Sequence, residues 1–160
     1  MASAFSVHPV RLKADLSDIA LLFEAYSNSL PVDLGYQDFA AELAALPGKY
    51  SPPEGDLLLA RDSSGGPVGC VALKPLPDAG ICEMKRLYVS PAARGAGLGK
   101  ALMLSVIAEA RRIGYDEMWL DTLPTMAAAQ NMYRDAGFRP MEPYYDTPVD
   151  GTLFLRLILA

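Results

Sequence analysis

The chain has 160 residues and a mass of 17.2 kDa, the size of one domain, and it is long enough to bury a core without disulfides or a metal. Hydrophobic residues make up 51% and charged residues 21%, which excludes extended disorder, and no apolar run approaches the ~20 residues that cross a bilayer. The net charge of −5 argues against a nucleic-acid partner, because proteins of that class carry basic surfaces. We therefore expect one domain over residues 1–160, with neither a membrane nor a nucleic acid as partner.

Turn residues and hydrophobic periodicity divide the first half of the chain into strands and helices. We expect an edge strand over residues 3–13, helices over 15–29 and 37–46, and strands over 56–62, 67–76 and 81–89. Pro9 assigns the first strand to an edge or a bulge, and Asp15 or Ser17 can cap the helix that follows. The last three strands are joined by turns of a few residues, so they are antiparallel.

The second half of the chain alternates helices and strands. We expect a helix over residues 98–113, a strand over 117–123, a helix over 125–136, and strands over 138–145 and 152–159. Gly114 and Gly137 end the two helices. Because the strand over 117–123 follows a helical crossover, it should lie parallel to the strand over 81–89. The order β-α-α-β-β-β-α-β-α-β-β predicts an α/β fold, a single-domain mixed sheet of about seven strands with helices on both faces.

The cysteines and the histidine point to no redox or metal chemistry. Cys70 and Cys82 fall within predicted strands, without a CxxC spacing or a nearby histidine, so we expect buried, reduced thiols. His8 is the single histidine of the chain, and we expect no metal site. The N-terminal residues lack the basic and apolar regions of a secretory signal, so we expect a cytoplasmic protein.

A glycine-rich loop lies between the strand over 81–89 and the helix over 98–113. Its glycines let the backbone approach a ligand closely, and the first turn of the following helix directs free N–H groups and a positive dipole end toward it. Residues 84–108 hold four basic residues, among them Arg94 and Lys100, and no acidic residue. Together these features predict an anion site, most often one for phosphate.

Three phosphate-binding patterns can be compared with this loop. A P-loop fails, because Arg94 stands in place of its first glycine and Ala101 in place of its Ser or Thr. A dinucleotide fingerprint fails at Lys100, which occupies the position of the third glycine. The pattern R-x-x-G-x-G is met by Arg94, Gly97 and Gly99. A nucleotide-binding protein is therefore the weaker alternative.

The strand EMKRLYVSP, the loop RGAGLG and the later YRDAGF resemble the GNAT superfamily of acetyl-CoA-dependent N-acyltransferases, and the order of elements matches that fold. The closing PYYDTPVDGTLFLRLIL is similar to a bacterial-type, small-substrate branch. The resemblance implies that acetyl-CoA is the acyl donor, that its pyrophosphate binds the loop, and that its pantetheine pairs with the preceding strand. The residues so implied are Leu87, Tyr88, Val89, Arg94, Gly95, Ala96, Gly97, Leu98, Gly99 and Lys100.

The resemblance also implies two catalytic residues. Tyr133 stands in the family's Y-x-x-x-G-F setting as a general acid for the leaving thiolate, although a tyrosine packed against the sheet fits the same pattern. Met126 occupies the place where the family often has a cofactor-binding asparagine, so that contact is not carried over. Glu83 is the candidate base, at the place of the glutamate of the histone acetyltransferase branch. An ion pair of Glu83 with Lys85 or Arg86, or an acceptor that arrives neutral, would leave it no such role.

The acceptor is a small-molecule amine in this interpretation. The residues expected to line its pocket are Arg86, Tyr26, Tyr36, Tyr144 and Tyr145, and packing explains each aromatic one equally well. The acidic segment over residues 13–62, with nine acids and three bases, favours a cationic amine, while Lys85 and Arg86 favour a carboxylate. An amino acid or an amino-bearing metabolite satisfies both. A non-catalytic acyl-CoA-binding or sensor module on the same fold is the alternative, and a homodimer is compatible with the sequence.

Overall fold

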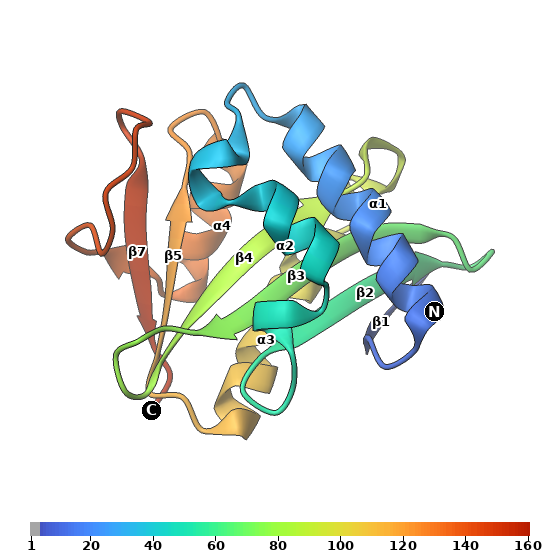
Figure 1. Ribbon diagram of the computed structural model, residues 1–160, viewed down its shortest axis with the longest axis horizontal. Helices are drawn as coiled ribbons and strands as arrows, with labels where there is room; N and C mark the ends of the chain where they lie inside the picture. The colour runs from blue at the N-terminus through green and yellow to red at the C-terminus, as the bar shows by residue number, and fades with distance from the viewer. Residues whose placement is uncertain (1–3) are drawn as a thin grey trace.

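The computed structural model describes residues 4–160, which form one seven-stranded sheet in the order β1-β2-β3-β4-β5-β7-β6 (Figure 1). The strands are β1 (Phe5–Pro9), β2 (Asp56–Asp62), β3 (Pro67–Pro75), β4 (Ile81–Val89), β5 (Glu117–Thr122), β6 (Arg139–Pro140) and β7 (Leu153–Ile158). The helices are α1 (Lys13–Ser29), α2 (Phe39–Ala45), α3 (Leu98–Ile113) and α4 (Ala127–Ala136), with short 3-10 turns η1 (Leu34–Gln37), η2 (Gly48–Tyr50) and η3 (Pro91–Ala93). The predicted fold class and the parallel pairing of β4 with β5 are confirmed.

Helices cover both faces of the sheet, α1 and α2 on one and α3 and α4 on the other (Figure 1). The side chains of β2 alternate between the two layers, because successive residues of a strand point to opposite faces. Leu57 and Leu59 pack with Phe23 of α1, while Leu58 packs with Leu102 of α3. Two buried cores therefore hold the helices to the sheet, one on each face.

Several elements follow the predicted bounds. Strands β2 and β4 and helix α3 have the expected ends, and Gly114 closes α3 with a φ of +107°. Strand β1 lies at the sheet edge, as Pro9 predicted. Both cysteines are free and buried, as expected. None of the helices within residues 4–160 is long and apolar enough to cross a bilayer.

The start of α1 corrects the prediction that Asp15 or Ser17 caps this helix. The helix begins at Lys13, and its N-cap, Leu12, makes no side-chain capping bond. Asp15 instead accepts a hydrogen bond of 2.7 Å from Arg61 on β2. The Asp15 carboxylate thus forms a tertiary ion pair with Arg61 and does not cap the helix.

The second helix and the last part of the chain also differ from the prediction. Residues 34–37 form the turn η1, and α2 begins only at Phe39. The strand expected over 138–145 is reduced to Arg139–Pro140, after which residues 141–152 form a loop. Pro140, Pro143 and Pro148 contribute to this difference, since proline cannot donate to a strand ladder.

The middle of the sheet opens between β4 and β5. The two strands pair over only three positions, ending at Glu83 opposite Trp119. Beyond this point β4 carries a bulge, where its register with β3 shifts and Arg86 takes a φ of +60°. This is an uncommon backbone conformation for a residue with a large side chain. The bulge and the short pairing separate the C-terminal half of β4 from β5.

Candidate active site

An outer groove of about 420 Å³ runs beside the end of β4 and the start of α4. Its wall includes Leu87, Tyr88 and Val89 of β4, together with Arg94 from the loop. Arg94 donates from Nε to the Val89 carbonyl at 3.0 Å, and its guanidinium lies 5.9 Å from the Tyr88 ring centroid. Four of the residues predicted to bind the cofactor therefore share one groove.

The glycine loop forms an open cradle at the N-terminus of α3. Gly95 and Gly97 have φ values of +89° and +78°, and apart from the adjacent residues nothing lies within 4 Å of the position that a Cβ would occupy on either. Gly97 is the N-cap of a helix of 16 residues, so its end presents unpaired N–H groups and positive dipole charge. Such a helix end attracts anions, phosphate groups among them. Lys100 lies one turn on and lines a separate groove between α3 and α4.

An inner cavity passes through the gap between β4 and β5. Its polar wall contains Tyr36 and Gln37 of η1, Lys85 of β4, and Asp121 and Thr122 of β5. Tyr26, Leu87, Met126 and Tyr133 line both the inner cavity and the outer groove. A ligand in the groove and a ligand in the cavity would therefore meet beside these four residues.

Tyr133 lies at this meeting point. Its side chain is buried, 6% exposed, and its ring packs against Phe138 with centroids 5.6 Å apart. Burial raises the pKa of Tyr133 above its ordinary value of 10, so the hydroxyl keeps its proton at neutral pH. The group can donate a hydrogen bond to an anion that forms beside it.

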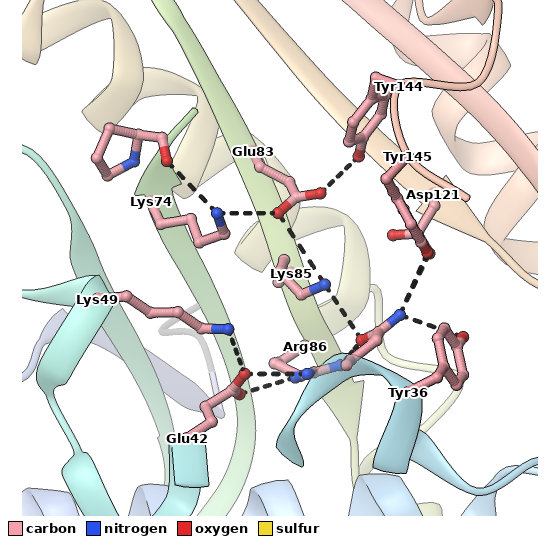
Figure 2. Close-up of polar contacts among 12 residues, drawn as sticks. Tyr36, Glu42, Lys49, Lys74, Glu83, Lys85, Arg86, Asp121, Tyr144 and Tyr145 are labelled. Carbon is pink, nitrogen blue, oxygen red and sulfur yellow. Dashed lines mark hydrogen bonds and ion pairs between the residues drawn. The ribbon is translucent and has the colours of Figure 1, made fainter. Parts of the chain in front are cut away.

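Glu83 is buried and is not part of the inner cavity wall, and Figure 2 shows its polar contacts. Its Oε2 accepts a hydrogen bond of 2.6 Å from the Tyr144 hydroxyl, and its Oε1 lies 3.6 Å from Lys74 Nζ and 4.0 Å from Lys85 Nζ. Lys85 reaches onward to Gln37 Oε1 at 3.2 Å. Burial lowers the pKa of Lys85, and the neighbouring carboxylate of Glu83 partly offsets this effect. Lys85 thus stands between Glu83 and the inner cavity.

Arg86 lines the inner cavity, but its charge is already compensated. Its guanidinium binds Glu42 through two bonds of 2.9 and 3.0 Å and donates to Gln37 Oε1 at 2.7 Å (Figure 2). Burial acts to raise the pKa of Glu42, and bonds from Arg86 and Lys49 outweigh it and lower that pKa to about 2. The strained conformation at the bulge therefore brings Arg86 into a buried ion pair that fixes α2 to the sheet.

Asp121 is a site residue that the sequence analysis missed. Its Oδ2 accepts a hydrogen bond of 2.6 Å from the Tyr145 hydroxyl and lies 3.5 Å from Gln37 Nε2. One signal existed, since Asp121 is an acid between the buried Leu120 and Thr122 of β5. Gln37 had no comparable signal, because its contacts with Lys85, Arg86, Asp121 and Tyr145 span 48 to 108 residues of sequence.

The predicted acceptor residues divide into two groups. Tyr26, Tyr36 and Arg86 line the inner cavity. Tyr144 and Tyr145 lie behind it and orient Glu83 and Asp121 through their hydroxyls. Within residues 4–160 no cluster of His, Cys, Asp and Glu could hold a metal ion.

Comparison with known proteins places these features in a family. The acetyltransferase (GNAT) family matches residues 19–138. An uncharacterized N-acetyltransferase of Schizosaccharomyces pombe is 42% identical over 99% of this chain and 97% of its own length. N-acetylaspartate synthetase of Homo sapiens is 30% identical over 88% of this chain, which corresponds to 47% of that protein. A Salmonella typhimurium acetyltransferase solved with its cofactor acetyl-CoA has the same fold, with a TM-score of 0.72 and 21% identity over 99% of this chain and 95% of its own.

Proposed function

The chain belongs to the acetyltransferase (GNAT) family, and we propose that it transfers the acetyl group of acetyl-CoA to the amine of a small, amino-acid-like acceptor. One observation carries this proposal. The outer groove and the inner cavity, each with its own set of polar groups, meet beside Tyr133 in the gap between β4 and β5. A two-substrate transfer needs such a meeting point, because the reacting atoms must come within about 3–3.5 Å of each other.

The outer groove is the proposed donor site. The cradle of Gly95 and Gly97, with the N-terminus of α3 and Arg94, would hold the diphosphate of CoA. Leu87, Tyr88 and Val89 lie beyond the point where β4 pairs with β5, which supports a main-chain pairing of this segment with the pantetheine. Acetyl-CoA supplies a thioester, which is an activated acetyl group. The likeness to the Salmonella typhimurium protein, solved with acetyl-CoA, supports this donor.

Tyr133 is the proposed proton donor for the departing thiolate. Its raised pKa keeps the phenol protonated over the whole neutral range. Burial also raises the pKa of a thiol formed beside Tyr133, because it disfavours the thiolate. The raised pKa of Tyr133 therefore does not by itself prevent proton transfer to the thiolate. The hydroxyl makes no hydrogen bond within residues 4–160, which leaves it available to a ligand.

The inner cavity is the proposed acceptor site, with charges of both signs in its wall. Asp121 can bind an ammonium, and Lys85 can bind a carboxylate. Arg86 shapes the wall, while Glu42 neutralises its charge. The likeness to an N-acetylaspartate synthetase, whose product is named for an amino acid, supports an acceptor of this class. Glu83 would then accept the amine proton only indirectly, because Lys85 lies between it and the cavity.

The test is release of CoA thiol from acetyl-CoA with matched pairs of acceptors, each pair being an amino acid and the amine that lacks its α-carboxylate. We expect the amino acid of the active pair to be used at least ~10-fold more efficiently, because one charge-assisted hydrogen bond is worth about 1.5–3 kcal/mol. Lys85→Met should remove most of that preference while leaving acetyl-CoA binding unchanged. Binding of acetyl-CoA without thiol release from any amine would instead support a sensor module.

A further inference from the structure

We propose that the hydroxyl of Thr122 donates a hydrogen bond to the acetyl carbonyl oxygen of the donor. Tyr133 would act on the sulfur of the same thioester. The inference rests on the proposed function, since it takes acetyl-CoA as the ligand of the outer groove. It concerns a residue of β5 to which the family resemblance assigned no role.

The first observation is a buried polar atom without a partner. Thr122 is 5% exposed, and its Oγ1 makes no hydrogen bond. Within residues 4–160 the hydroxyl oxygen of Tyr50 is the other side-chain polar atom that is itself fully buried and makes no hydrogen bond. A buried hydroxyl without a partner costs free energy, so each one in a native structure calls for an explanation.

The second observation is the place of this hydroxyl. Thr122 lines the inner cavity together with Tyr133. It lies three residues beyond Trp119, where the pairing of β4 with β5 ends, so it belongs to the separated part of the sheet. Tyr50 does not line that cavity or the outer groove, so its unpaired hydroxyl carries no such implication.

The face of β5 distinguishes the donor side from the acceptor side. Thr122 points to the same face as Leu120, because they are two residues apart in a strand. Leu120 packs in the same core as Tyr133. Asp121 points to the opposite face, where it meets Gln37 and Tyr145. The Thr122 side chain therefore points to the face of the sheet on which Tyr133 packs, and the Asp121 side chain points to the other face, while both residues line the inner cavity.

The chemistry of the hydroxyl suits a thioester. A threonine donates one hydrogen bond and carries no charge, so it can bind a neutral carbonyl without a buried counter-ion. When the amine attacks, negative charge develops on that oxygen, and a fixed donor stabilises it more than it stabilises the ground state. The free energy that this unpaired hydroxyl costs the ligand-free protein would be recovered when the acetyl group arrives.

Thr122→Val tests the proposal, because valine has nearly the same shape and lacks the hydroxyl. Without ligand, the melting temperature of the variant should rise by about 2–4 °C, since an unpaired buried hydroxyl is removed. By calorimetry, its Kd for acetyl-CoA should increase about 3–10-fold, the range expected for one net hydrogen bond. Its Kd for free CoA, which lacks the acetyl carbonyl, should stay at the wild-type value.

Three further variants make the result specific. Thr122→Ser keeps the hydroxyl and should retain wild-type affinity, while Thr122→Ala removes it with a smaller side chain and should reproduce the loss. Tyr50→Phe removes the other unpaired hydroxyl, outside both cavities, and should leave acetyl-CoA binding unchanged.

The outcomes separate this inference from the proposed function. Equal acetyl-CoA affinity in wild type, Thr122→Val and Thr122→Ala would overturn the role of Thr122 and leave the donor site standing. An equal loss for acetyl-CoA and free CoA would also overturn it, because the contact would then be with the pantetheine arm. Absence of acetyl-CoA binding by the wild-type protein would instead refute the proposed function.

Discussion

The donor side and the acceptor side of the site are built in different ways. The part of the proposed donor site that would hold the diphosphate comes from one short stretch, residues 94–98, and its central feature is backbone, with glycines at positive φ and a helix N-terminus. The acceptor side is made of side chains that come from η1, α2, β4, β5 and the loop before β7, with contacts 24 to 108 residues apart in sequence. A backbone site can hold the common part of a cofactor, while an assembly of distant side chains can change its ligand by single substitutions.

If the acceptor side depends on distant ion pairs, breaking one should cost stability. Glu42→Gln leaves the buried Arg86 without its counter-charge, and we expect the free energy of unfolding to fall by about 3–5 kcal/mol. Glu109→Gln, which breaks an ion pair with the exposed Arg112 on α3, should change it little. Urea denaturation of both variants measures the difference, and an equal effect would show that the pair Arg86–Glu42 is not special.

The same pair predicts a pH dependence. The pKa of Glu42 is lowered from 4.5 to about 2 in the folded protein. A carboxyl group with a depressed folded-state pKa stabilises the protein above its unfolded pKa, and this stabilisation is lost as the pH falls toward the folded value. We therefore expect part of the decrease in unfolding free energy between pH 4.5 and 2 to disappear in Glu42→Gln. A parallel decrease in both proteins would assign the acid sensitivity to other carboxylates.

If the donor side is a backbone site, a side chain in its cradle should abolish binding. Gly97→Glu places a negative charge and a strained φ at the N-cap of α3. Wild type should gain about 2.7 kcal/mol of stability from acetyl-CoA at 100 Kd, and the variant should gain none. Gly65→Glu is the matched control, since Gly65 has a φ of +86° and open space in the distant β2–β3 turn. Acetyl-CoA should stabilise this control as it does the wild type, as measured by thermal shift.

Tyr133 lines both the donor groove and the acceptor cavity. A change at Tyr133 should therefore lower kcat more than it lowers the affinity for either substrate. Tyr133→Phe keeps the packing on Phe138 and removes the hydroxyl, and we expect kcat to fall about 10²-fold with little change in acetyl-CoA affinity. Tyr115→Phe, whose hydroxyl donates to the Glu54 carbonyl outside both cavities, should keep full activity. Wild-type turnover in a folded Tyr133→Phe protein would return this residue to a packing role.

Glu83 gives the smallest and most conditional effect, because Lys85 separates it from the cavity. Glu83→Gln can still bond to Tyr144 but cannot accept a proton. We expect roughly a 10-fold lower kcat/KM at pH 7, recovered as the pH rises toward 10, where about 30% of a lysine-like amine is neutral. A pH–rate profile of wild-type shape, only scaled down, would show that Glu83 positions the site and that the base lies elsewhere.

The donor side was also the part most open to prediction. Strand β4, the loop and helix α3 have the expected bounds, because their signals are local: an apolar strand, glycines that permit positive φ, and Gly114 as a stop. The acceptor side resisted prediction for the opposite reason. No residue near Arg86 in the sequence predicts that Glu42, 44 residues away, neutralises its charge.

The sequence by itself determined the order of elements, the glycine cradle and the family, since these depend on periodicity and on residues that are neighbours along the chain. Only the tertiary structure decided that β4 leaves β5 after Glu83, that Asp15 pairs with Arg61 instead of capping α1, and that Asp121 enters the cavity wall. The physical reason is the range of the interactions. Backbone conformation and helix ends are set within a few residues, whereas the partner of a buried charge is whichever opposite charge the packed sheet and helices bring to it.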